Sequence, residues 1–379
     1  MASGSVICEN AAPPHSTPAS GTLPNRPAPT RVNRAELLLE YPFAAPPPPG
    51  EVREVAPGVH WLRMPLPFAL DHINLWALED GAGLALVDTG VGNDATRALW
   101  QQVFDGFVKG RPVTRVIATH LHPDHAGNAG WLTARFGAPL WMSQSDYLMA
   151  HAWSENTSGF SIDAMLAHLA RHGLAGDLFD GQASRGNAYR HSVPDFPRTY
   201  RRIIEGEALA IGGRTWRVIM GYGHAPEHAS LYCQALGVLI SGDMLLPRIS
   251  TNISVNQVDP DANPLALFLA SLHRYTQEIA GDPLVLPSHG LPFRGMRERV
   301  GQLEAHHAAR LEELEDACAE PKSPADVIGT LFRRKLDVHQ IFFAMGESLA
   351  HLNYLMHAGR FVRREGADGV VRFVRAGSA

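Results

Sequence analysis

The segment 119–128, THLHPDHAGN, holds three histidines and one aspartate within six residues. It follows the short apolar run 113–118, which predicts a buried strand. A loop at the carboxyl end of a strand is anchored by the sheet, so closely spaced side chains on it can converge on one point. Imidazole nitrogens suit zinc and iron, and a neighbouring carboxylate suits a second ion. The spacing H-x-H-x-D-H therefore indicates a metal site rather than a set of unrelated polar loop residues.

Three further segments carry residues of the same types and follow in order along the chain. They are 223–228 (GHAPEH), 241–243 (SGD) and 287–290 (PSHG), and each lies just past a predicted strand. Together with H-x-H-x-D-H they resemble the signature of the metallo-β-lactamase-fold hydrolases, over about residues 51–296. The resemblance implies an α/β fold, namely a four-layer αββα sandwich. It is specific for the fold and only weakly specific for the substrate.

The resemblance also implies a site for two divalent metal ions. The first ion is expected on His120, His122 and His224, and the second on Asp124, His125 and His289, with Asp243 bridging them. Zinc is the default for such a set, and iron or manganese fits the same ligands. Two cations lower the pKa of a shared water, so the implied nucleophile is a metal-bridged hydroxide. Asp124 and Asp243 are expected to orient it and to carry its proton to the leaving group.

Two residues near these ligands, Asp88 and His228, have expected supporting roles, and a third, Glu227, departs from the family pattern. Asp88, in the segment 88–90 (DTG), is expected to accept a hydrogen bond from a ligand imidazole or its loop, which would fix the tautomer. Its alternative is an ordinary turn aspartate. His228 is a candidate for proton transfer rather than a further ligand. Glu227 stands where the family often has glycine, so the turn can differ here and the role of His228 stays open.

The predicted elements place these loops at the ends of strands. Strands are predicted over 59–64, 73–78, 84–87, 206–211, 214–220, 230–236 and 284–286, and helices over 95–107, 265–279 and just past Gly127. The segment 143–202 interrupts this pattern with aromatic residues and helical spacing over 162–172. In this fold such an insertion commonly roofs the active site. The alternative is that its aromatic residues only pack a small helical subdomain.

Candidate substrate contacts come from two places. Trp153 lies in the insertion, and Arg248, Ser250 and Asn252 closely follow Asp243. The latter three could orient a carboxylate, carbonyl or phosphate. They are equally well explained as ordinary residues of a surface loop.

The two ends of the chain differ from its middle. Residues 1–50 hold 11 of the 28 prolines and predict a disordered Pro-rich tail, with a short helical stretch over 35–41 that docks on the body. Beyond 297, helices over 300–319, 325–332 and 342–358 precede a hairpin of 361–363 and 370–374. This C-terminal domain, 297–379, resembles the winged-helix-like tail of some members of the fold, including single-strand RNA endonucleases.

Composition limits the remaining possibilities. The chain has 379 residues, 45% of them hydrophobic and 19% charged, which is typical of a soluble protein with two domains. The net charge of −5 argues against a chain that is basic throughout, and three widely spaced cysteines give no disulfide framework. No stretch is apolar enough for a membrane span, and no signal peptide is visible. A cytoplasmic location is therefore expected.

Three functions fit these observations to different degrees. A dinuclear hydrolase of a small carbonyl substrate, which is a thioester, lactone, ester or amide, is favoured by the aromatic insertion. A phosphodiesterase acting on RNA is the alternative that the tail suggests, since 331–379 carries eight Lys or Arg and four Asp or Glu. That patch fits a solvated surface or a homodimer contact better. A metal-binding protein without turnover is disfavoured because the ligand set is complete.

Overall fold

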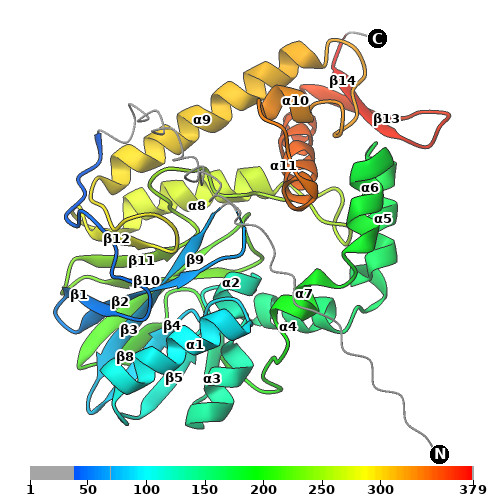
Figure 1. Cartoon of the computed structure of the whole chain (residues 1–379). Coiled ribbons are helices and arrows are strands. Elements are labelled where there is room, and N and C mark those ends of the chain that lie inside the picture. The colour runs from blue at the N-terminus through cyan, green and yellow to red at the C-terminus, as the bar shows by residue number, and fades with distance from the viewer. Residues whose placement is uncertain (1–37, 69, 378–379) are drawn as a thin grey trace, which may run out of the picture.

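The computed structural model describes residues 38–68 and 70–377. Two sheets pack face to face and helices cover both outer faces, which makes a four-layer αββα sandwich (Figure 1). Helices α1 and α3 lie over one sheet, and α8 and α9 lie over the other. The fold class expected from the resemblance is therefore confirmed.

The first sheet has the order β1-β2-β3-β4-β5-β6-β7. Its strands are β1 (Val52–Ala56), β2 (Val59–Pro65), β3 (His72–Asp80), β4 (Gly83–Val87), β5 (Val113–Ile117), β6 (Leu140–Met142) and β7 (Arg201–Arg202). The first four are antiparallel neighbours, and pairing from β4 to β7 is parallel. The second sheet, in the order β12-β11-β10-β9-β8, holds β8 (Ala208–Ile211), β9 (Arg214–Gly221), β10 (His228–Cys233), β11 (Val238–Gly242) and β12 (Leu284–Pro287).

Three tryptophans fill the space between the two sheets. Trp61 and Trp76 stack with ring centroids 6.1 Å apart, and Trp216 from the second sheet belongs to the same buried cluster. Burial of large aromatic side chains contributes strongly to stability. The sheets are thereby fixed against each other, and so are the loops at their edges.

The metal-loop segments all follow the carboxyl ends of strands. β4 and β5 are parallel neighbours, as are β11 and β12. Asp88 follows β4, segment 119–128 follows β5, Asp243 follows β11 and His289 follows β12. Parallel strands end at the same edge of a sheet. The topology therefore brings loops from distant parts of the chain together.

The helices of the body differ from the prediction in detail. They are α1 (Asp94–Val103), a π-helical turn over Phe104–Val108, α2 (Pro123–Ala126), α3 (Ala129–Phe136) and α8 (Pro264–Glu278). The helix predicted to start just past Gly127 is preceded by α2, which starts inside the metal-loop segment at Pro123. Proline is compatible with the first position of a helix, because its missing N–H would have no partner there.

The insertion is helical. It contains α4 (Gln144–Ser154), a 3-10 turn over Ser158–Phe160, α5 (Ile162–Arg171), α6 (Gly176–Ser184) and α7 (Ala188–Ser192). Leu169 and Leu174 pack with Ile341, Ala344 and Met345 of the C-terminal region in one buried cluster. The insertion therefore rests on the C-terminal region as well as on the sheet.

The C-terminal region contains α9 (Met296–Ala317), α10 (Ile328–Leu331), α11 (Val338–His357) and the hairpin β13 (Phe361–Glu365) with β14 (Val371–Arg375). One buried cluster joins Tyr232 of the second sheet to Phe268 of α8, Leu303 of α9, Leu349 of α11 and Phe373 of the hairpin. The boundary expected at 297 thus lies within a continuous core, because α9 packs directly on α8. The winged-helix-like character of the region stays a prediction.

Only the second part of the predicted N-terminal tail, residues 38–50, can be compared with the structure. Residues 1–37 of the predicted tail lie outside the described residues. Residues 38–50 lie on the body: Leu39 is 6% exposed, and Glu40 pairs with Arg294 through backbone hydrogen bonds. The described part of the stretch expected to dock, 38–41, thus lies on the body. Beyond it, Phe43 packs edge-on against Trp61 with ring centroids 6.2 Å apart, so disorder is wrong for this residue as well. No helix in the described part of the chain has the length and apolarity that a membrane span requires.

The shared core predicts a single unfolding transition. Replacing the fully buried Phe373 by alanine should lower the free energy of unfolding by about 3–5 kcal/mol, measured in urea by circular dichroism. Val362→Ala on the same hairpin, where the side chain is 42% exposed, should change it by less than about 0.5 kcal/mol. A separate early transition for the C-terminal region in Phe373→Ala would contradict the shared core.

Candidate metal centre

Seven donor side chains form two adjacent groups at the edge of the sandwich. The first group is His120, His122, His224 and Asp243, and the second is Asp124, His125 and His289. Within each group the donor atoms all lie within 4.8 Å of one another. All seven residues predicted as ligands are thus brought together, from four loops.

The first group is built around two short nitrogen contacts. His120 Nε2 lies 2.9 Å from His122 Nδ1 and 3.2 Å from His224 Nε2. His224 Nδ1 lies 2.6 Å from the carbonyl oxygen of Asn252, which can only accept a hydrogen bond. The proton of His224 is therefore on Nδ1, and Nε2 turns a bare lone pair toward His120.

The second group pairs two imidazoles with two carboxylates. His289 Nε2 lies 3.4 Å from Asp124 Oδ2 and 3.4 Å from Asp243 Oδ1. His125 Nε2 lies 3.7 Å from Asp124 Oδ2 and 3.5 Å from Asp243 Oδ1. His289 Nδ1 contacts the carbonyl oxygen of His72 at 2.8 Å, which leaves Nε2 of His289 for the centre.

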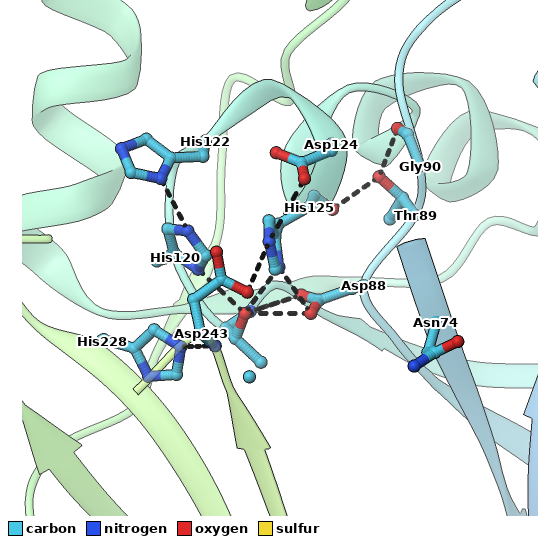
Figure 2. Close-up of polar contacts among 12 residues, drawn as sticks. Asn74, Asp88, Thr89, Gly90, His120, His122, Asp124, His125, His228 and Asp243 are labelled. Atoms are coloured by element: carbon cyan, nitrogen blue, oxygen red, sulfur yellow. Dashed lines mark hydrogen bonds and ion pairs between the residues drawn. The ribbon is translucent and has the colours of Figure 1, made fainter. Parts of the chain in front are cut away.

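Figure 2 shows the side chain of Asp243 beside His120 of the first group and His125 of the second. Its Oδ2 is 3.3 Å from His224 Nε2, while its Oδ1 faces His125 and His289. Asp243 Oδ1 and His125 Nε2 are buried without a hydrogen-bond partner among the described residues. Buried polar atoms are almost always paired, so converging unpaired lone pairs call for a cation. The donor set therefore fits two divalent ions that share Asp243.

The electrostatics of both donor groups also favour bound cations. Burial lowers the pKa of His120 well below its usual value and that of His122 to about 3, and neighbouring imidazoles lower both further. Burial opposes protonation of His289 too, but Asp243 and Asp124 outweigh it and raise its pKa to about 10. In the first group the imidazoles are therefore held neutral, as metal ligands must be. In the second group the two carboxylates favour positive charge beside them, which a divalent cation would supply in place of protons.

Asp88 supports the second group from behind. It is fully buried, and its Oδ2 lies 2.8 Å from His125 Nδ1, while Thr119 donates to Oδ1 from its backbone N–H at 2.8 Å. Asp88 adopts the left-handed region, with φ of 63°, which aspartate tolerates better than most residues. Its carboxylate is therefore held so that His125 turns Nε2 toward the centre, the arrangement typical of carboxylate–histidine–metal sites.

His228 lies behind Asp243 rather than at the open side of the centre. It is fully buried, and its Nε2 accepts a hydrogen bond of 3.1 Å from the backbone N–H of Asp243. A Cβ on Gly242, whose φ is +54°, would lie 2.2 Å from this Nε2, so glycine permits the close approach. This placement favours a role in positioning Asp243 over the proton transfer proposed from sequence.

Glu227 turns away from the centre. Its Oε2 accepts a hydrogen bond of 3.1 Å from the backbone N–H of Ser145, and its own N–H donates to Asp146 Oδ2 at 2.7 Å. The carboxylate therefore ties the His224 loop to α4 and does not join the donor groups.

Asp146 is a supporting residue that sequence reasoning missed. Besides Glu227, it accepts a hydrogen bond of 2.9 Å from the backbone N–H of Leu121, so one buried carboxylate holds two metal loops. Burial raises its pKa to about 6. The S-x-x-D pattern over 143–146 signals the start of a helix. Its partners lie 25 and 81 residues away, and the pattern carries no information about them.

A cavity of about 270 Å³ adjoins the centre and is lined by His122 and His224. Trp153 and Asn252, two of the predicted substrate contacts, also line it. Arg248 and Ser250 are not among its lining residues, and Arg248 is exposed. The chain turns outward after the buried Leu246, whose carbonyl oxygen accepts a hydrogen bond of 2.6 Å from Arg299 Nε. Their proposed role in substrate binding therefore gains no support.

The fold and the paired donor groups define a metal-binding αββα protein, and comparison with known proteins identifies its family. The model of the metallo-beta-lactamase superfamily matches residues 69–316, and that of the metallo-beta-lactamase-like C-terminal domain matches 311–376. The chain therefore belongs to the metallo-beta-lactamase superfamily and carries the C-terminal domain found in some of its members.

Several relatives share most of the chain. A beta-lactamase domain protein from Burkholderia ambifaria is 52% identical, covers 91% of this chain and all of its own, and superposes with a TM-score of 0.85. The metallo-beta-lactamase family protein TTHA1429 from Thermus thermophilus is 31% identical over 85% of this chain and all of its own, with a TM-score of 0.73. The probable metallo-hydrolase YqjP of Bacillus subtilis (strain 168) is 27% identical over 78% of this chain and 91% of its own.

The position of Asp243 predicts how metal content responds to substitution. His289→Ala should leave one tightly bound cation, whereas Asp243→Asn should weaken both, since it removes the charge that the groups share. Loss of a direct ligand should cost more than the roughly 10–100-fold caused by losing an outer partner. Zn²⁺ stoichiometry and affinity, measured against a competing chelator, test this. Asp316→Asn, with a 91% exposed side chain, is the matched control. Equal effects of the two site variants would contradict a bridging role.

Proposed function

We propose that the chain is a dinuclear metal-dependent hydrolase of carbonyl substrates, acting on a thioester or carboxylic ester with an apolar acyl group. The observation that carries the proposal is the cavity beside His122 and His224. It opens directly onto the first donor group, so a chain held in it would end at the metal centre. Membership of the superfamily and the similarity to a probable metallo-hydrolase support hydrolysis as the reaction class.

The lining of the cavity is mainly apolar. It is contributed by the insertion (Met149, Trp153, Met165, Leu169), the loop before α8 (Val255, Val258) and α11 (Phe342, Phe343, Met345, Leu349). Binding sites for small molecules are typically apolar with a few polar groups that orient the ligand. An alkyl or aryl acyl group fits this environment, and its carbonyl carbon would lie at the end where the donor groups are.

Among the described residues that line the cavity there is no lysine or arginine. Phosphate backbones are bound chiefly by such cations, so the RNA alternative gains no support from it. The cavity also has polar lining residues. The insertion contributes His168 and His172, and the loop before α8 contributes Asn252 and Asp259. Lactones and amides share the reacting carbonyl group and belong in the same substrate panel.

The residues of the metal centre would have separate roles in this reaction. Two divalent cations, for which zinc is the first choice and iron or manganese the alternatives, would activate water and stabilise negative charge on the substrate oxygen. Asp124 directs Oδ2 at the second donor group, and its side chain is 14% exposed, so its carboxylate can accept a proton at the other oxygen, Oδ1, and deliver it to the leaving group. Asp88 and the carbonyl of Asn252 hold the ligand imidazoles in the required tautomers.

A substrate screen tests the function. Purified protein loaded with Zn²⁺ should hydrolyse acyl-CoA thioesters and aryl esters, and His122→Ala should abolish turnover. Bis-aryl phosphodiesters and single-stranded RNA should not be cleaved. kcat/KM should rise about fourfold per methylene, because burial of a CH₂ contributes about 0.8 kcal/mol. The rise should level off once the acyl chain fills the cavity of about 270 Å³.

Cleavage of phosphodiesters or RNA alone would overturn the proposal in favour of a nuclease. Ester hydrolysis with a kcat/KM that does not depend on acyl length would support hydrolase activity but contradict binding of the acyl group in the cavity.

A cavity-filling pair gives an independent check on the acyl group. Ala262 lines the cavity, so Ala262→Leu should lower kcat/KM for long acyl chains and spare acetyl substrates. Ala270→Leu, an exposed position on α8, should leave the chain-length profile unchanged. The profile across acetyl to dodecanoyl esters is the measurement. A uniform loss at all chain lengths in Ala262→Leu would speak against this location of the acyl group.

A further inference from the structure

We infer that helix α11 of the C-terminal region sets the orientation of the ligand His224, which makes this region part of the metal centre. The connection runs from α11 through the loop 251–256 to the imidazole of His224. The inference concerns the metal centre alone and does not depend on the identity of the substrate.

The first step is the contact between His224 and the loop. The carbonyl oxygen of Asn252 accepts the hydrogen of His224 Nδ1 at 2.6 Å. This contact fixes both the tautomer and the ring plane, and Nε2 of His224 is thereby directed at His120 Nε2, 3.2 Å away, and at Asp243 Oδ2, 3.3 Å away. Displacement of the Asn252 carbonyl would rotate this ligand.

The second step is the attachment of the loop to α11. Residues 251–256 have no helix or strand of their own. The backbone N–H of Val255 donates to the carbonyl oxygen of Gly346 at 3.2 Å. The side-chain amide of Asn252 donates to the carbonyl oxygen of Phe343 at 3.5 Å and to Glu347 Oε2 at 3.4 Å. The loop is therefore attached to consecutive turns of one helix, and its first residue, Thr251, also donates to the carbonyl oxygen of Asp243.

The third step is the close approach at Gly346. A Cβ on this residue would lie 2.6 Å from Ser254 Oγ and 2.7 Å from Ser254 Cβ. The φ of Gly346 is not positive, so its conformation does not require glycine. Glycine is a poor helix former, and only the contact with Ser254 explains one in the middle of α11. Ser254 Oγ in turn donates to Asn252 Oδ1 at 2.7 Å, so a shift of Ser254 passes directly to Asn252.

The two donor groups differ in the outer contacts that hold their imidazoles. The part of the loop that α11 holds directly, Asn252, contacts the imidazole of His224, whereas the imidazoles of the second group are supported by Asp88 and by the carbonyl of His72. The loop reaches the second group only through Thr251, whose hydroxyl donates to the backbone carbonyl of the shared Asp243. A positioning role of α11 must therefore alter the first group more strongly than the second. A purely structural role would alter both equally or neither.

The test is Gly346→Ala, read out as Zn²⁺ affinity of the metal-free full-length protein against a competing chelator. In a His289→Ala background, which reports the first group, affinity should fall about 10–100-fold, the range for loss of an outer partner. In a His120→Ala background, which reports the second group, it should fall by a clearly smaller factor. Ser254→Gly removes the colliding atoms, so it should restore affinity when combined with Gly346→Ala. Gly301→Ala on α9, where no described atom lies within 4 Å of the added Cβ, is the matched control.

Unchanged affinity at the first group in folded Gly346→Ala would overturn the inference, and so would an equal loss at both groups or a failure of Ser254→Gly to restore binding. If Gly346→Ala does not fold, Asn252→Ala replaces it. This variant keeps the backbone carbonyl but loses the amide contacts with α11, and selective weakening of the first group is again the expected result. Because Zn²⁺ binding is the readout, a failed substrate screen leaves this test intact.

Discussion

The structure depends on the burial of imidazole nitrogens and carboxylates that converge on one point. His120, His224 and His125 direct their Nε2 atoms inward, and Asp243 directs one oxygen at each donor group. Such an arrangement is costly without positive charge, so the surrounding protein must both hold the donors in place and bind cations. The outer contacts of the ligands with Asp88 and with the carbonyls of His72 and Asn252 are the means of holding them.

The sandwich supplies the rigidity that these contacts require. The donors stand at the ends of strands whose sheets are locked together by a tryptophan-rich layer. Further support comes from regions remote in sequence: Asp146 of the insertion holds two metal loops, and α11 holds the loop of Asn252. The same two regions line the cavity beside the centre. Metal binding and the shape of the cavity are therefore coupled through the packing of the insertion against α11.

Much of the fold could be anticipated because its signals are local. Alternating and continuous apolar runs marked most strands, and the spacing of histidines and aspartates marked the loops. The predictions that gained no support were also local in origin. Residues 42–50 were expected to be disordered from their prolines, yet Phe43 packs edge-on against Trp61. Arg248 and Ser250 were placed near the centre by their proximity to Asp243, but the chain turns outward between them.

The sequence by itself indicated a metal site at 119–128 from residue type and spacing, and its resemblance to the family signature implied the seven donor residues, their order and the fold that carries them. Only the tertiary structure decided what surrounds them. His228 lies behind Asp243, Glu227 binds to α4, Asp146 joins two loops, and Gly346 lets a helix from the C-terminal region approach Ser254. Each of these roles depends on a partner far away in the chain. Such pairings arise from the packing of whole layers, which local patterns do not encode.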